Sequence, residues 1–296
     1  MSDFPTFNAK TTAQDAATAL AEQIRGKTVL ITGTSIGGIG FEAARVLARY
    51  AGMVIISGYD RERLRLSAAA IEKEVPSANI RQLVLDLSSL AAVRKAAAEV
   101  NAYSEPLHVI IHNAAASGSL ALNPTIDGLE PRMATALVGP FLLTKLLARS
   151  RPELTARLLY ILRLYTPRCG GAKAAGILFA SELSRRAGGR IGAYSLHPGA
   201  IFTNMNQKGQ DKLDLIGMGA LTAEGLPDET KFTWKTMGEG AATELVPAST
   251  IVAAFDPRLD SKAGAYLDDC VEANEKETAS RLWEIAEAIV GEKFAF

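Results

Sequence analysis

Short apolar runs alternate with longer amphipathic segments along most of the chain. The apolar runs are rich in Val, Ile and Leu, which is typical of buried strands. We predict strands over residues 27–33, 53–58, 80–87, 107–113, 156–162, 190–196 and 264–269. The segments between them carry apolar positions at helical spacing. We predict helices over residues 11–25, 41–50, 61–75, 88–100, 127–149 and 280–291, and another after Lys173.

Strands that alternate with helices in this way form βαβ units and a parallel sheet. We therefore predict an α/β fold, a doubly wound parallel sheet of the Rossmann type with helices on both faces. No linker interrupts the alternation, so residues 1–296 are expected to form a single domain. Residues 11–25 are typical of a surface helix capped by Thr11 or Thr12. Residues 202–236 lack clear periodicity, and so long a stretch is usually a functional lid or disordered.

Four glycines, Gly33, Gly37, Gly38 and Gly40, lie between the first predicted strand and the next helix, in a loop with Ser35 and Ile39. A phosphate needs close backbone approach and free N–H groups at the positive end of a helix. Glycines at a strand-to-helix turn allow both. A tight glycine turn without a ligand is the plainer alternative, but the strand–turn–helix context favours a dinucleotide site.

Several motifs together resemble the short-chain dehydrogenase/reductase family, and within it a branch of fungal retinol-dehydrogenase-like and WW-domain-oxidoreductase-like proteins. Thr32-Gly33 and Gly38-Ile39-Gly40 are similar to the family's TGxxxGxG loop, with one extra residue between them. Residues 255–270 and 282–294 are similar to the C-terminal signature of that branch. The resemblance implies nucleotide contacts from Asp86 and Leu87 at the adenine, Asn113 and Ala114 at the adenosine, and Pro198, Gly199 and Thr203 at the nicotinamide end.

The end of the second predicted strand bears on the choice between NAD and NADP. An acidic residue there would accept the ribose hydroxyls of NAD and repel a 2′-phosphate. Gly58 stands where NAD-dependent relatives carry Asp, and Tyr59 stands where NADP-dependent relatives carry Arg. Ser57 and Arg61 could hold a 2′-phosphate, whereas Asp60 argues for NAD. We favour NADP and keep NAD as the alternative; Arg61 would otherwise be an exposed residue of the first helical turn.

The resemblance also implies four catalytic positions: a proton-transferring tyrosine, a lysine four residues later, a serine that holds the substrate oxygen and an asparagine that keeps a relay water. Lys173 matches the lysine, which places Cys169 at the tyrosine position. Ala136 stands at the asparagine position, and the serine position falls on Leu162 or Arg163. Three of the four positions are therefore substituted, and the stretch before Lys173 is shorter than in relatives.

Cysteine is a weak replacement for tyrosine in carbonyl reduction. The ordinary pKa of a cysteine thiol is about 8.5 and that of a tyrosine is about 10. A nearby lysine would lower the cysteine pKa further, toward a thiolate that is a poor proton donor. Cys169 would otherwise be a small buried hydrophobe. Tyr165 is another candidate donor, whereas Tyr160, His108, His112 and His197 fit packing roles better.

Composition limits the partners. Lys plus Arg and Asp plus Glu each number 32, so the formal net charge is zero and nothing indicates nucleic acid as a partner. Two cysteines, Cys169 and Cys270, are too few and too distant for a disulfide framework, which favours a reducing compartment. No apolar run reaches the ~18 residues that a membrane span needs, and the first residues lack the apolar core of a signal peptide. We expect a cytoplasmic protein without a metal site.

The resemblance implies an NAD(P)(H)-dependent oxidoreductase acting on an alcohol or ketone of a lipophilic small molecule, as in secondary metabolism. Apolar residues of the lid favour such a ligand, although they would equally seal the pocket; these are Leu213, Leu215, Ile216, Met218 and Leu221. The alternative is a protein that binds the nucleotide without hydride transfer, as a sensor, a scaffold or a non-redox catalyst. A wrongly assigned exon boundary would also explain residues 160–172, but not Ala136.

The resemblance implies that subunits associate through the long helix and the helix after Lys173, as in dimeric or tetrameric relatives. The alanine-rich residues 173–183 would suit such a homo-oligomer. The same pattern would equally pack on the sheet of its own subunit.

Overall fold

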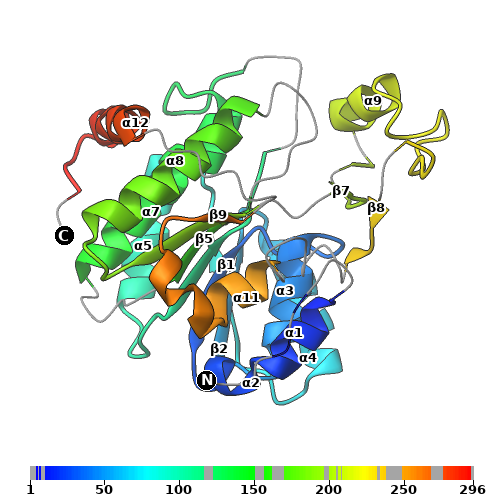
Figure 1. Cartoon of the computed structure of the whole chain (residues 1–296), viewed down its shortest axis with the longest axis horizontal. Coiled ribbons are helices and arrows are strands. Elements are labelled where there is room, and N and C mark those ends of the chain that lie inside the picture. Colours follow the sequence, from blue (N-terminus) through cyan, green and yellow to red (C-terminus); the bar gives the residue numbers. More distant parts are fainter. Residues whose placement is uncertain are drawn as a thin grey trace.

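A computed structural model describes Pro5, Phe7 and residues 11–116, 123–150, 157–161, 170–196, 200–204, 206–207, 209–231, 234–237, 249–267 and 276–294. The centre of the molecule is a seven-stranded sheet in the order β3-β2-β1-β4-β5-β6-β9, in which every neighbouring pair is parallel (Figure 1). The strands are β1 (Thr28–Thr32), β2 (Met53–Gly58), β3 (Ile80–Val84), β4 (Val109–His112), β5 (Arg157–Ile161), β6 (Gly192–Leu196) and β9 (Tyr266–Leu267). The predicted doubly wound α/β fold is confirmed.

Helices cover both faces of the sheet (Figure 1). One face packs against α1 (Ala13–Ala19), α3 (Ile39–Leu47), α4 (Arg61–Glu74) and α11 (Ser249–Phe255). The other packs against α5 (Leu90–Asn101), α7 (Gly139–Ser150) and α8 (Gly170–Arg186), with α12 (Lys276–Val290) outside them. Alternate residues of β1 point to opposite faces, so Val29 and Ile31 join the first core and Leu30 the second. Both faces are covered, which is why β1 is apolar without interruption.

The strand order reverses at β1, which has β2 on one side and β4 on the other. The chain runs outward from β1 to β3, then crosses back to β4 and continues to β9. The loops that follow β1 and β4 therefore diverge and leave a crevice at the carboxyl ends of the strands. In open parallel sheets this switch point is where ligands bind.

The first predicted helix differs from the expected surface helix over residues 11–25. It forms two short helices, α1 and α2 (Ala21–Ile24), and its apolar side is buried against α3 and α11. Thr12 caps α1: its hydroxyl accepts from Asp15 N at 3.1 Å, and the Asp15 carboxylate accepts from Thr12 N at 3.0 Å. This reciprocal cap satisfies two N–H groups at the start of the helix.

The long helix expected over residues 127–149 begins later, at α6 (Pro131–Met133), and continues through the π-helical turn η1 (Ala134–Val138) into α7. The Asp127 carboxylate accepts from Leu90 N at 2.8 Å and so caps α5, which draws this segment away from the helix. Glu130 caps α6 by accepting from Met133 N at 2.7 Å. Gly139 follows η1, and a Cβ there would lie 2.3 Å from Leu87 O. The absence of a side chain thus lets α7 approach the loop after β3.

The helix after Lys173 packs on β5 and β6 of its own sheet, and α12 lies along its other side. Trp283 of α12 is almost fully buried and forms ring contacts with Phe141, Phe179 and Phe294 at centroid distances between 5.0 and 5.5 Å. Ser280 of α12 donates to the buried Glu182 carboxylate of α8 at 3.0 Å. A helix of the same chain therefore covers the side of α8 that would otherwise be available for subunit contacts.

The predicted lid segment contains elements that periodicity did not reveal. It includes α9 (Gly209–Gly217) and a small sheet of β7 (Ala200–Ile201) and β8 (Trp234–Lys235). Leu215, Ala220 and Leu221 form a separate core with Phe202, Ile216 and Trp234. Leu213 and Met218 are exposed. The segment stands apart from the main body in Figure 1. Other elements that the sequence did not predict are α11 and the 3₁₀ helix η3 (Pro257–Lys262).

Among the described residues, no helix combines the length and the apolar character that crossing a bilayer requires.

Candidate functional site

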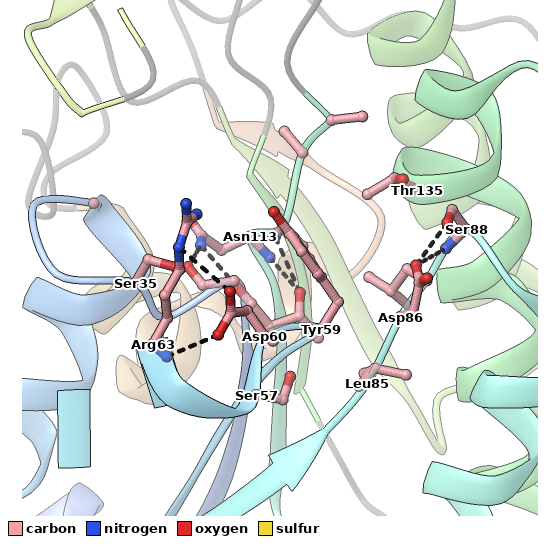
Figure 2. Close-up of a pocket in the computed structure, with 18 of the residues that line it drawn as sticks. Ser35, Ser57, Tyr59, Asp60, Arg63, Leu85, Asp86, Ser88, Asn113 and Thr135 are labelled. Carbon is pink, nitrogen blue, oxygen red and sulfur yellow. Dashed lines mark hydrogen bonds and ion pairs between the residues drawn. The ribbon is translucent and has the colours of Figure 1, made fainter. Parts of the chain in front are cut away.

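A cavity of about 590 Å³ opens at the carboxyl ends of β1 to β4, where the strand order reverses. Its size is ordinary for a small-molecule or cofactor site. Its walls come from the loops after these four strands, the start of the α6–η1 helix and the root of the lid. Figure 2 shows side chains from these segments converging on one space.

The glycine-rich loop after β1 is shaped by close backbone contacts. Gly33 has φ +73°, and a Cβ there would lie 2.7 Å from Ala114 Cα. Gly40, the second residue of α3, packs under the loop, and a Cβ there would lie 2.6 Å from Gly33 O and 2.3 Å from Asn113 Nδ2. Gly37 also has a positive φ of +77°. The predicted glycines are thus needed for this turn, as expected for a backbone that must approach a ligand closely.

Asn113 ties the loops after β1 and β4 together. Its side-chain Nδ2 donates to Thr32 O and Gly33 O, both at 2.8 Å. Thr32 Oγ1 in turn accepts from Asn113 N and Ala114 N, both at 3.0 Å. Both residues are buried, so the bonds are protected from competition with water. This network holds the two walls of the crevice at a fixed separation.

The N-terminus of α3 faces the cavity through its cap residue, Gly38. No side chain of the described residues caps this end of the helix. The first N–H groups of a helix have no partner within it and carry the positive end of the helix dipole. This arrangement is suited to an anion such as a pyrophosphate.

Asp86 and Ser88 form the far wall of the cavity, after β3 (Figure 2). Asp86 Oδ1 accepts from Ser88 N at 2.9 Å and from Ser88 Oγ at 2.6 Å. These bonds fix the orientation of the carboxylate, and a fixed carboxylate is an acceptor for an amino group such as that of adenine. Leu87 and Thr135 also line the cavity near this wall. Ala114 lines it from the loop after β4.

The β2 end of the cavity contains Ser57, Tyr59, Asp60 and Arg63 (Figure 2). Ser57 is fully buried, and its Oγ has no hydrogen bond to any residue that the structure describes. Asp60 caps α4 by accepting from Arg63 N at 3.0 Å, and its other oxygen lies 3.8 Å from Arg63 Nε. Arg63 therefore offsets the negative charge that argued for NAD. The predicted phosphate ligand Arg61 is exposed, and Arg63 is the arginine that lines the cavity.

The lid contributes Asn204 and Gly209 to the cavity. The neighbouring Thr203, predicted to contact the nicotinamide end, is buried and bonds within its own turn, with Oγ1 donating to Asn206 Oδ1 at 2.7 Å. Asn204 donates directly to the glycine-rich loop, from Nδ2 to Ile36 O at 2.9 Å. The sequence offered no signal for Asn204 beyond its place after Thr203.

Most of the predicted catalytic positions lie outside the described residues, including Cys169, Tyr165, Leu162 and Arg163, as do the predicted cofactor residues Pro198 and Gly199. Lys173 lies in the first turns of α8. Ala136 lies in the π-helical turn η1, the kind of irregular turn that is frequent at functional sites. The side chain of an alanine has no polar group that could hold a water.

His108, just before β4, and His112, its last residue, have structural roles. His112 is buried, and its Nε2 lies 3.0 Å from Thr144 Oγ1. Burial lowers the pKa of His112 to about 3, so the ring is neutral at physiological pH. His108 Nδ1 accepts from Thr28 N at 3.0 Å at the opposite end of the strand. Neither ring is placed for proton transfer in the cavity.

Comparison with known proteins relates this site to one family. Residues 27–153 match a family model described as short chain dehydrogenase. The chain is 30% identical over 283 residues to the short-chain dehydrogenase/reductase prx1 of Penicillium rubens, covering 85% of this chain and 76% of that protein. It is 29% identical over 308 residues to the WW domain-containing oxidoreductase of Danio rerio, covering 92% of this chain and 70% of that protein.

The backbone is similar to that of a short chain dehydrogenase from Burkholderia cenocepacia J2315 in complex with NADP. The TM-score is 0.62 at 24% identity, with 83% of this chain and 96% of that chain covered. This likeness supports the fold. The relative from Penicillium is 30% identical over most of both chains, and the crevice lies where the family's nucleotide motifs predict it. The chain therefore belongs to the short-chain dehydrogenase/reductase family, in the branch of the fungal reductases and WW domain-containing oxidoreductases.

Proposed function

We propose that this protein is an NADP(H)-binding oxidoreductase that acts on an alcohol or ketone of a lipophilic small molecule, with altered proton-transfer groups. The observation that carries the proposal is the intact nucleotide cavity. The Thr32–Asn113 network, the two crowded glycines and the fixed Asp86 carboxylate all survive together. A bound nicotinamide nucleotide would supply the hydride or accept it.

The residues of the cavity fit such a nucleotide. Gly33 and Gly40 leave a bare backbone beside the N-terminus of α3, which would hold the pyrophosphate. The Asp86 carboxylate would accept from the adenine amino group. The buried Ser57 hydroxyl, which has no partner among the described residues, would donate to an oxygen of the adenosine ribose or of its 2′-phosphate.

Two features support NADP over NAD. Arg63 lines the cavity beside Ser57, and its guanidinium would pair with a 2′-phosphate. Gly58 carries no carboxylate, and Asp60 is occupied as the cap of α4 and neutralised by Arg63. NAD is the alternative, for which Asp60 would have to leave its cap.

The chemistry beside the nicotinamide rests on the family resemblance. Lys173 would bind the nicotinamide ribose, and Cys169 or Tyr165 would be the groups nearest the substrate oxygen. Ala136 has no polar side chain to hold a relay water, so proton transfer would have to follow another route or be slow. The alanine at position 136 favours a second candidate function, that of a protein that binds the nucleotide without hydride transfer. The exposed Leu213 and Met218 of the lid support a lipophilic substrate, and a cytoplasmic location stays a prediction from the sequence.

Nucleotide titration followed by turnover tests the proposal. NADPH is expected to bind the purified protein with nicotinamide fluorescence enhancement, and more tightly than NADH. Turnover is then measured with a panel of apolar ketones and alcohols for wild type, Cys169→Ala and Cys169→Tyr. A rate in wild type that rises sharply in Cys169→Tyr supports an oxidoreductase with impaired proton transfer. Binding without turnover in all three supports the second candidate, and no binding of either nucleotide overturns both.

A further inference from the structure

We propose that Asn204 is a positioning residue for the nucleotide, and that its bonds to the glycine-rich loop control how fast the nucleotide enters and leaves. This inference rests on the proposed nucleotide site. Asn204 lies at the root of the lid, between β7 and α9, and lines the cavity. Two hydrogen bonds join it to the glycine-rich loop, which lines the same cavity.

The contact consists of two hydrogen bonds to consecutive residues. Asn204 Nδ2 donates to Ile36 O at 2.9 Å, and Asn204 N donates to Gly37 O at 3.1 Å. The Asn204 side chain is also the nearest neighbour of Gly37, because a Cβ built on that glycine would lie 3.5 Å from Asn204 Cβ. One residue of the lid thus satisfies two successive carbonyl groups of the loop.

These bonds matter because they hold the outer part of the loop. The inner part is held by the sheet, since Ser57 O accepts from Gly33 N at 2.9 Å and from Thr34 N at 3.1 Å. Gly37 has a positive φ, and Gly38 begins α3 without a side-chain cap. Within the turn, Gly38 N donates to Ser35 O at 3.1 Å. The loop is therefore a glycine-rich turn whose outward carbonyls are held by Asn204. A loop fixed in this way presents the start of α3 to a phosphate at a smaller ordering cost.

Asn204 is itself held in place by its own turn. Asn206 Oδ1 accepts from Thr203 N and from Thr203 Oγ1, both at 2.7 Å, and Asn206 N donates back to Thr203 O at 3.0 Å. Thr203 and Asn206 are both buried. This closed turn presents the Asn204 amide to the loop, so movement of the lid root must break the two bonds to Ile36 and Gly37. Opening of the lid is in this way coupled to the shape of the phosphate-binding loop.

Stopped-flow measurement of NADPH association and release tests the inference in Asn204→Asp, Asn204→Ala and wild type. Asn79→Ala is the matched control, because Asn79 Nδ2 also donates to a backbone oxygen, Gly52 O, at 2.9 Å, but before β3 at the opposite end of the sheet. Loss of the donated bond is expected to raise the release rate roughly three- to tenfold in both Asn204 variants. Asn79→Ala is expected to release NADPH at the wild-type rate.

A second ligand separates positioning from general damage. Adenosine 2′-monophosphate occupies only the β2–β3 end of the site and lacks the pyrophosphate. Its affinity is expected to stay within about twofold of wild type in the Asn204 variants, whereas a merely structural defect would weaken both ligands together. If one variant is unstable, the other and its thermal midpoint provide the comparison.

The outcomes distinguish the two proposals. If wild type binds neither NADPH nor NADH, the nucleotide site and the role of Asn204 fail together. If wild type binds NADPH and both Asn204 variants release it at the wild-type rate, the nucleotide site stands and the role of Asn204 is overturned. Equal weakening of NADPH and adenosine 2′-monophosphate also overturns it.

Discussion

Gly40 lies against the side chain of Asn113 so closely that even one added carbon would overlap it. A Cβ at Gly40 would lie 2.3 Å from Asn113 Nδ2, the nitrogen that donates to both Thr32 O and Gly33 O. The glycine of the first βα turn and the asparagine after β4 are therefore one structural unit. Their contact brings two loops together on either side of the switch point in the sheet.

Gly40→Ala is predicted to displace Asn113 and to damage the nucleotide site. Overpacking of a tightly packed site costs about 1–3 kcal/mol, and here the neighbours include the backbone oxygen of Gly33. Urea unfolding and NADPH titration measure the two effects. Gly217→Ala is the control, since a Cβ there meets open space. A Gly40→Ala protein with wild-type stability and wild-type NADPH affinity would contradict the contact.

Arg63→Ala is predicted to weaken NADPH binding more than NADH binding. The guanidinium is partly exposed, so the loss for NADPH is expected to be roughly five- to tenfold, with little change for NADH. Arg61→Ala is the matched control, because Arg61 lies two residues earlier in the same helix and is exposed away from the cavity lining. Fluorescence titration with both nucleotides measures the ratio. If Arg61→Ala weakened NADPH binding more than Arg63→Ala did, Arg61, as expected from the sequence, would be the residue that binds the 2′-phosphate.

Trp283→Ala is predicted to destabilise the protein by about 3–5 kcal/mol, because it would leave a cavity among Phe141, Phe179 and Phe294. The same change at Ile289, which is 39% exposed on α12, is expected to cost far less. The free energy of unfolding in urea gives both values. Similar small losses for the two variants would mean that α12 does not pack on α8 in solution. With α12 in place, we expect no dimer through the outer side of α8.

Stability is predicted to fall as the pH drops below about 6.5, the ordinary histidine pKa. Burial lowers the pKa of His112 to about 3 and, together with the charge of Lys27, also lowers that of His108. Below pH 6.5 these histidines therefore bind protons in the unfolded chain but stay neutral in the folded chain. Their contribution to the free energy of unfolding is complete above pH 6.5 and is lost as the pH falls. Below that pH the buried His112 removes up to about 1.4 kcal/mol per pH unit, and the more exposed His108 acts in the same direction.

The free energy of unfolding in urea between pH 7.5 and pH 5.5 measures this slope, since most carboxylates titrate at lower pH. His112→Asn removes the main titrating group, and the slope is expected to become clearly shallower. An unchanged slope in that variant would show that His112 is not the source of the acid sensitivity.

The sequence by itself determined which segments form most of the strands and helices, and their order along the chain. Continuous apolar runs such as Val29–Ile31 are typical of strands that are buried on both faces, and such a run is visible in the local sequence. Gly33 and Gly40 were equally predictable, because a glycine-rich turn between a strand and a helix has a local signature. The role of Asp86 was implied only by the family resemblance. The start of α6 could not be predicted from the sequence, because the Asp127 side chain bonds to the start of α5 instead of continuing the helix.

Only the tertiary structure decided which residues meet across the site. Asn204 bonds to Ile36 across 168 residues of sequence, Arg63 rather than Arg61 turns toward the cavity, and Trp283 covers α8. The periodicity of apolar residues indicates which side of a helix or strand is buried, but it does not indicate which other element packs against that side. That choice depends on how the open sheet positions distant loops, and it is made only when the whole chain has folded.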